Sequence, residues 1–136
     1  MTNINETNEN CVFCKIIAGK IPATKIWEDE EYFIMLDVNP RNPGHTLVIP
    51  KKHDNYLFDL NDKEYSELML KAKEVSKILK ERLNPKRVGL VVEGFGVPHV
   101  HIHLIPINKA DELGKEKMRN IGSDELNKIA KLIRGK

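Results

Sequence analysis

Every second residue is a histidine in the stretch Pro98-His99-Val100-His101-Ile102-His103-Leu104-Ile105. Because successive side chains of a β-strand point to opposite faces, the three histidines share one face and Val100, Ile102 and Leu104 share the other. The apolar face is typical of a strand that packs on a core. This stretch therefore predicts a strand over residues 100–107, with a row of imidazoles on its second face.

A row of three imidazoles is a poor choice for structure alone, because each ring needs partners for two nitrogens and packs less well than valine or isoleucine. Two chemistries suit it: metal ligation through neutral imidazole, and nucleophilic or proton-transfer work near neutral pH. The other two histidines, His45 and His53, lie in a second short window. This clustering of all five histidines is the strongest functional signal in the sequence.

The two cysteines, Cys11 and Cys14, stand three residues apart. That spacing suits metal binding or redox chemistry better than a disulfide that holds a fold together. A tetrahedral structural zinc needs two further ligands, which His53 and one histidine of the triplet can supply. The alternative is a buried or redox-active thiol pair. Spacing alone leaves both interpretations open.

The apolar patterns along the chain predict an α+β fold, with a mostly antiparallel sheet of about five strands. Strand patterns cover residues 24–27, 32–38, 46–49, 87–92 and 100–107, and the last two are joined by a turn at Gly94-Phe95-Gly96. One long helix over 61–83 begins at Asn61, with Glu64 three residues on. A short helix is expected over 11–18, and a C-terminal helix over 123–134 with Ser123 as its N-cap.

Length and composition fit one globular domain that stays in the cytoplasm. The chain has 136 residues, 40% of them apolar, and a net charge of +2. That small charge argues against a general nucleic-acid binder, and no apolar stretch is long enough to cross a membrane. Residues 1–10 are polar and lack the pattern of a signal peptide, so a disordered tail is expected there.

The stretch from His99 to Ile105 resembles the signature of the histidine-triad (HIT) nucleotide-binding family. Residues 14–23 (CKIIAGKIPA), 36–38 (LDV) and 44–53 (GHTLVIPKKH) also resemble its Hint branch, in the same order and at similar separations. The resemblance runs from about Cys11 to Pro106 and is specific because it joins four segments. It implies a HIT-like fold, with residues 11–136 forming one domain; the segment after Ile107 matches no part of the family pattern.

The resemblance implies a homodimeric hydrolase that cleaves purine nucleotide conjugates, such as nucleoside phosphoramidates or adenylates, at the α-phosphate. The central histidine, His101, would then be the nucleophile and form a covalent nucleotidyl-histidine intermediate that water hydrolyses. His103 and the backbone N–H groups near Gly96 would hold the phosphate oxygens. His45 would support the proton network around the triad.

The resemblance also suggests where the nucleoside and a metal would bind. The nucleoside would lie between the first helix and the early strands, with Asp37 in the place of the acid that contacts the ribose hydroxyls. The base pocket would be lined by residues at or near Val12, Phe13, Ile16, Ile21, Leu36 and Val38. In zinc-containing bacterial members of the family, the ligands of the structural zinc match Cys11, Cys14, His53 and His99.

One segment departs from the family pattern. The family usually has a longer loop before the triad, with an Asn, then a Gln and a Ser or Thr that contact the phosphate. Here the stretch is Glu93-Gly94-Phe95-Gly96-Val97-Pro98. Its two glycines still allow backbone donors to approach a phosphate, but the side chain that would protonate the leaving group is missing. Two alternatives are therefore a catalytically weak nucleotide- or partner-binding module, and a dinucleoside polyphosphate hydrolase with a different leaving group.

Overall fold

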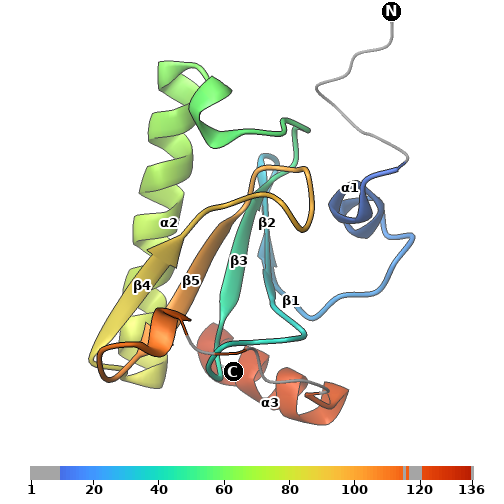
Figure 1. Cartoon of the computed structure of the whole chain (residues 1–136). Helices are drawn as coiled ribbons and strands as arrows, with labels where there is room; N and C mark the ends of the chain where they lie inside the picture. The colour runs from blue at the N-terminus through green and yellow to red at the C-terminus, as the bar shows by residue number, and fades with distance from the viewer. Residues whose placement is uncertain (1–9, 115, 117–120, 136) are drawn as a thin grey trace, which may run out of the picture.

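A five-stranded antiparallel sheet forms the centre of the protein (Figure 1), in a computed structural model that describes residues 10–114, 116 and 121–135. The expected tail at 1–10 lies almost entirely outside the described residues. The strands are β1 (Lys25–Glu28), β2 (Tyr32–Leu36), β3 (Thr46–Pro50), β4 (Arg87–Val91) and β5 (Ile102–Ile107). The helices are α1 (Val12–Ile17), α2 (Asp62–Leu83) and α3 (Ser123–Arg134), with single 3-10 turns at Leu57–Asp59 and Glu112–Gly114.

The α+β prediction is confirmed, and the strand order is β1-β2-β3-β5-β4. Helix α2 starts where expected, because Asn61 and Glu64 form a capping box, and it ends at Asn84 in the left-handed conformation. Since α2 connects β3 to β4 across the sheet, β5 rather than β4 lies beside β3, and β4 is left at an edge.

The two faces of the sheet carry two separate apolar clusters. One face packs against α2 and α3 and includes the apolar residues of the triad stretch, Val100, Ile102 and Leu104. The other face packs against α1 through Phe13, Ile16 and both cysteines. Strand β2 contributes to both clusters, because its alternate side chains face opposite ways. The alternation predicted for the triad stretch therefore places its apolar residues in the core and its histidines on the opposite face of the sheet.

Strand β5 begins two residues later than predicted, so His99 and His101 precede it. The register pairs Val48 with Ile102, and Pro50 would therefore come opposite Val100. Proline has no N–H for the ladder, and the Val100 N–H donates instead to the Asp54 carbonyl at 2.7 Å. The predicted strand is present, but a proline in the neighbouring strand shortens its pairing.

Two local predictions are wrong. The N-cap of α3 is Gly122 rather than Ser123, with no side-chain cap hydrogen bond, because Ser123 already has helical geometry. The β4–β5 connection is also longer than a turn at Gly94-Phe95-Gly96: Val91 pairs with His103, so residues 92–101 all lie in the loop. Within the part of the chain that is described, no helix is both long and apolar enough to span a bilayer.

Candidate active site and metal centre

The backbone fixes which nitrogen of His101 carries a lone pair. Its Nδ1 lies 2.7 Å from the His99 carbonyl oxygen, which can only accept, so Nδ1 is the protonated nitrogen of the neutral ring. Nε2 is then the basic nitrogen. The edge of Phe13 packs on the ring at 4.8 Å between centroids, and His101 is only 4% exposed. Helix α1 therefore covers His101 through Phe13, and the ring is not an exposed side chain.

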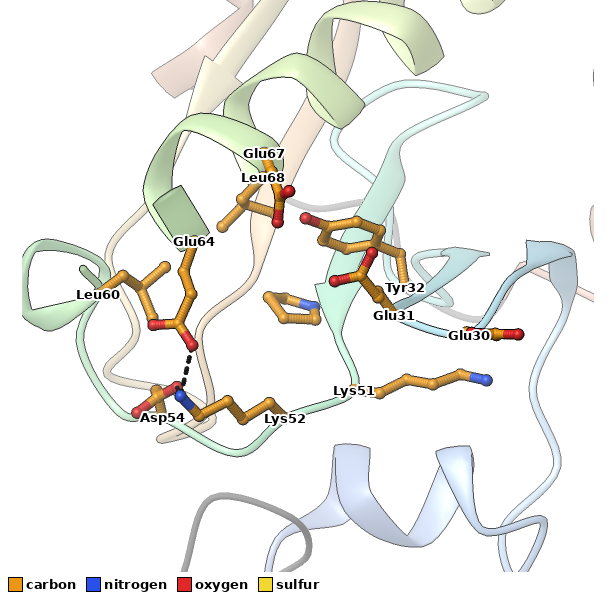
Figure 2. Close-up of a pocket in the computed structure, with 11 residues that line it drawn as sticks. Glu30, Glu31, Tyr32, Lys51, Lys52, Asp54, Leu60, Glu64, Glu67 and Leu68 are labelled. Atoms are coloured by element: carbon orange, nitrogen blue, oxygen red, sulfur yellow. Dashed lines mark hydrogen bonds and ion pairs between the residues drawn. The ribbon is translucent and has the colours of Figure 1, made fainter. Parts of the chain in front are cut away.

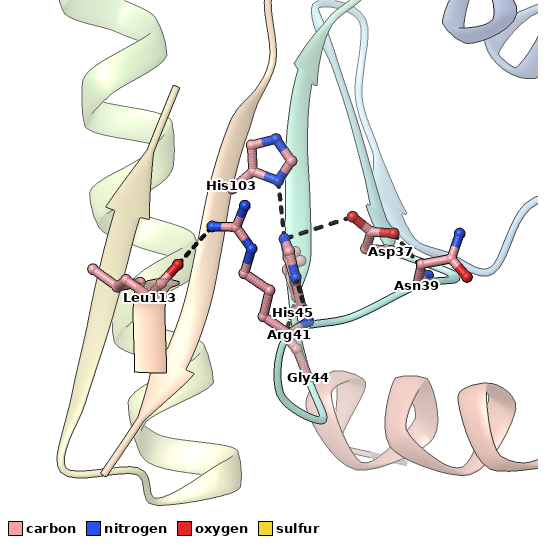
Figure 3. A network of polar contacts seen from close by, with 8 residues as sticks. Asp37, Asn39, Arg41, Gly44, His45, His103 and Leu113 are labelled. Carbon is pink, nitrogen blue, oxygen red and sulfur yellow. Dashed lines mark hydrogen bonds and ion pairs between the residues drawn. The ribbon is translucent and has the colours of Figure 1, made fainter. Parts of the chain in front are cut away.

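His45 and His103 form a directed proton chain (Figure 3). The Arg41 backbone N–H donates to His45 Nδ1 at 3.0 Å, so the proton of the neutral His45 ring is on Nε2. That atom lies 2.9 Å from His103 Nδ1, which accepts the proton's hydrogen bond. His103 consequently carries its own proton on Nε2, the nitrogen suited to donate to an anion.

Asp37 lies at the end of this chain. Its Oδ2 is 3.6 Å from His45 Nε2, and its Oδ1 accepts the Asn39 backbone N–H at 2.8 Å. The Asp37 carboxylate is mostly buried, with 13% of the side chain exposed. Asp37, His45 and His103 are close enough together for a metal ion as well, but the 2.9 Å contact between the two rings is that of a hydrogen bond.

Cys11, Cys14, His53 and His99 converge at a second, fully buried centre, with their ligand atoms within 4.8 Å of one another. The Nδ1 atom of His99 lies 3.3 Å from Cys11 Sγ, 3.5 Å from Cys14 Sγ and 3.1 Å from His53 Nδ1. In a tetrahedral zinc site with bonds of about 2.0–2.3 Å, neighbouring ligand atoms lie about 3.3–3.8 Å apart. Three sulfur–nitrogen separations, of 3.3–3.5 Å, fall in this range, and two thiols with two imidazoles are the donor types of a structural zinc site.

Hydrogen bonds to the far side of both rings direct their lone pairs into this centre. His99 Nε2 donates to the Pro50 carbonyl at 2.7 Å, and His53 Nε2 to Asn55 Oδ1 at 3.1 Å. Both Nδ1 atoms therefore face each other unprotonated, beside two sulfurs. Burial lowers the pKa of His99 to about 4, which keeps its ring neutral and able to bind a metal. This arrangement of two unprotonated nitrogens and two sulfurs is suited to hold a metal ion.

Only some of the residues expected to line the base pocket lie together in the structure. Phe13 and Ile16 are buried on the α1 face, and Ile21 packs against them. Val12 and Val38 are 37% and 51% exposed and stay open to solvent. Leu36 does not line this face, because it points into the core under α2 and α3, opposite to Phe13. The pattern of β2, in which neighbouring residues face opposite ways, explains this correction.

The loop that departs from the family pattern lies open beside the triad stretch. Phe95 is 91% exposed, and Gly96 has open space where a side chain would start. Gly94 has a φ of +78°, a conformation that other residues rarely adopt. A backbone rich in glycine therefore remains accessible where the family carries an amide and a hydroxyl.

A pocket of about 180 Å³ lies on the other face of the sheet, beside the start of α2 (Figure 2). Tyr32 and Leu68 form part of its wall, and Lys52 pairs with Glu64 across it. Burial, reinforced by nearby carboxylates such as Glu31, raises the pKa of Tyr32 to about 12. No histidine or cysteine is among the residues that line this pocket, so it is separate from both histidine clusters.

Three groups at the site were not found in the sequence. The Pro50 carbonyl and Asn55 orient the two histidines of the candidate metal centre, and the Arg41 backbone N–H donates to His45. Asn55 stands two residues after His53, a spacing that offers a weak signal for a ring partner. The other two contacts arise from the tertiary fold, and no local sequence pattern predicts them.

Comparison with known proteins identifies the class that this fold and site define. The sequence profile of the HIT domain matches residues 18–110, and the chain belongs to the HIT family. An uncharacterized HIT-like protein of Methanocaldococcus jannaschii is 41% identical over 128 residues, covering 89% of this chain and 98% of that protein. The adenosine 5'-monophosphoramidase of Candida albicans is 37% identical over 115 residues, covering 78% of this chain and 74% of the enzyme.

Solved structures agree with this assignment. A HIT-like protein of Bartonella henselae has a TM-score of 0.83 and 28% identity, covering 95% of this chain and 97% of its own. A zinc-bound histidine triad family protein of Mycobacterium smegmatis has a TM-score of 0.79 and 29% identity, and the match covers 93% of this chain and 91% of that protein. The predicted family and HIT-like fold are confirmed.

Proposed function

We propose that the protein is a nucleotidyl hydrolase that cleaves purine nucleoside phosphoramidates or adenylates at the α-phosphate. The observation that carries this proposal is the orientation of the two rings: His101 presents a basic Nε2, and His103 presents an Nε2–H donor. Similarity to fungal adenosine 5'-monophosphoramidases supports the substrate class. Release of AMP from adenosine 5'-phosphoramidate by the purified protein tests it directly.

In the first step, the His101 Nε2 lone pair attacks phosphorus and the P–N bond breaks. The amine leaves with the bonding electron pair and takes up a proton from solvent, since residues 93–98 offer no hydroxyl or amide side chain for the transfer. His103 and backbone N–H groups near Gly96 hold the phosphate oxygens as charge shifts onto them. Water then attacks the nucleotidyl-histidine, which releases the nucleoside monophosphate and restores His101.

We further propose that a structural zinc binds Cys11, Cys14, His53 and His99. The four convergent ligand atoms and the similarity to a zinc-bound family member support this assignment. When bound, the ion would link the start of α1 to the residues just before β5, and so hold the helix that covers His101. In this proposal His101 and His103 carry out catalysis, and the metal would stabilise the structure around them.

The open loop favours one alternative, a nucleotide-binding module with little turnover. It lacks the polar side chains that the family uses on the phosphate, although Gly94 and Gly96 keep backbone donors available. Normal AMP binding without cleavage of any phosphoramidate or dinucleoside polyphosphate would support this alternative. Measurable AMP release would decide for the hydrolase.

Replacing Asp37 with alanine is expected to weaken binding of ribonucleotides more than that of deoxyribonucleotides. A carboxylate that accepts hydrogen bonds from ribose hydroxyls distinguishes the two sugars, and each charge-assisted bond is worth about 1.5–3 kcal/mol. Calorimetric titration with AMP and dAMP measures the difference. Equal affinity of variant and parent for both sugars would show that Asp37 only supports the loop through its contact with the Asn39 N–H.

We also propose that the protein is a homodimer formed through β4. Among the residues that the structure describes, this strand pairs with β5 alone, and an unpaired sheet edge can pair with the same edge of a second copy. Leu90 on β4 and Leu70 on α2 are 43% and 63% exposed in the single chain. Light scattering should give twice the 15.6 kDa mass of the chain. A mass near that of one chain at every concentration would contradict the dimer.

A further inference from the structure

The buried part of the Arg41 guanidinium is not fully hydrogen-bonded. Its Nη1 donates to the Leu113 carbonyl at 2.7 Å, whereas its Nε is buried and has no hydrogen-bond partner among the described residues. None of the carboxylates in the described part of the chain forms an ion pair with it. A partly buried cation without a counter-charge is costly, so an anionic ligand would stabilise this arrangement.

The Arg41 side chain lies on the same face of the sheet as the triad. Leu113, whose carbonyl it contacts, covers Gly89, where an added Cβ would lie 2.6 Å from the leucine side chain. Gly89 is paired with Ile105, which shares a strand face with His103 two residues earlier. The guanidinium therefore lies on the triad face of the sheet, on the side toward His103 (Figure 3), and not in the core under α2.

Asp37 and Arg41 lie on opposite sides of the His45 and His103 rings (Figure 3). In the proposed function, the ribose contacts Asp37 and the α-phosphate contacts His103. An in-line attack by His101 puts the leaving group on the far side of the phosphorus from that ring. The row His101, His103 and Ile105 shares one strand face, and the guanidinium contacts Leu113 beside Gly89, which is paired with Ile105, so it lies on that far side. Asp37 and Arg41 would thus contact the two ends of one bound substrate.

We propose that Arg41 binds an anionic group, a phosphate or a carboxylate, on the leaving side of the substrate. This inference rests on the proposed hydrolase function and specifies its substrate class. The guanidinium carries a planar fork of N–H donors that matches either anion. Arg41 would not change which bond breaks; it would select leaving groups that carry negative charge.

Matched substrates test this selection. The first is the adenosine 5'-phosphoramidate of an amino acid with a free carboxylate, and the second is that of the same amino acid amide, which is neutral. Arg41→Gln should lower kcat/KM at least about tenfold more for the carboxylate substrate than for the amide, as expected for one lost charge-assisted bond. Arg41→Lys should restore part of the difference, because it keeps the charge. Lys109→Gln, which removes an exposed cation in the neighbouring segment, is the control and should show no such difference.

Binding provides a second readout that does not need turnover. Arg41→Gln should weaken ADP, which carries a further phosphate, more than AMP, as measured by calorimetry. A selective loss for ADP alone would assign Arg41 to a phosphate, and one for the carboxylate substrate alone would assign it to a carboxylate; either supports the proposal.

Two results would overturn it, and they differ from each other. The first is an equal effect of Arg41→Gln on the carboxylate and amide substrates and on ADP and AMP, while the parent protein binds AMP normally. This result would show that Arg41 only anchors the loop to Leu113. Absence of AMP and ADP binding by the parent protein would contradict the proposed function and this inference with it. Thermal unfolding of Arg41→Gln, compared with the parent, confirms that the variant tested is folded.

Discussion

Replacing His101 is expected to reduce AMP release from a phosphoramidate more than about 1,000-fold, the usual result of removing a covalent nucleophile. His99 points its lone pair into the metal centre and His103 presents an N–H, so neither ring can take over the attack. Steady-state turnover of wild type and variant measures the effect. Full turnover by the variant would contradict the role of His101.

The choice of substitution matters because His101 is buried against Phe13. His101→Ala leaves a cavity and should also cost about 2 kcal/mol of unfolding free energy. His101→Asn is the better variant, since its side-chain amide can still donate to the His99 carbonyl while it lacks the attacking Nε2. We expect the asparagine variant to keep its zinc and bind AMP, yet to be as inactive as the alanine variant.

Replacing His99 with alanine is expected to release the metal and lower the free energy of unfolding by at least about 3 kcal/mol. The substitution removes one of four ligands and also the contact with the Pro50 carbonyl that connects two segments. Elemental analysis should find one zinc per chain in the wild type and none in the variant. Wild-type protein without zinc, together with two freely titratable thiols, would contradict the metal centre.

A matched variant separates loss of the metal from loss of packing. His45 is as fully buried as His99 but belongs to the other cluster, so His45→Ala should lower stability and still retain zinc. A chelator provides the complementary control. It should lower the unfolding temperature of the wild type and of His45→Ala but not that of His99→Ala, which has no metal to lose.

The regular parts of the molecule could be predicted because their signals are local. The alternation in residues 99–105 separated the site from the core, and the period of residues 61–83 with its capping box located α2. The four residues of the candidate metal centre could also be predicted to lie together, although His53 and His99 stand far apart in sequence, because few other residues offer sulfur or imidazole. The small number of cysteines and histidines limited the possible ligand sets, even though the ligands come from distant parts of the sequence.

What could not be predicted depends on contacts between segments that are distant in sequence. The start of β5 is set by Pro50 on the neighbouring strand, and the burial of His101 is set by Phe13 on α1. The position of the Arg41 guanidinium depends on Leu113, which follows the region of family resemblance. No local pattern encodes such contacts, since each becomes visible only when the segments are packed together.

In the proposed reaction, His101 Nε2 forms a covalent bond to the α-phosphorus. Intact-protein mass spectrometry after mixing with adenosine 5'-phosphoramidate and rapid acid-free quenching tests it most directly. The proposal predicts a transient species heavier than the chain by one adenylyl group, mapped to His101 by fragmentation and missing from His101→Asn. AMP release without any adduct, or an equal adduct in His101→Asn, would contradict it.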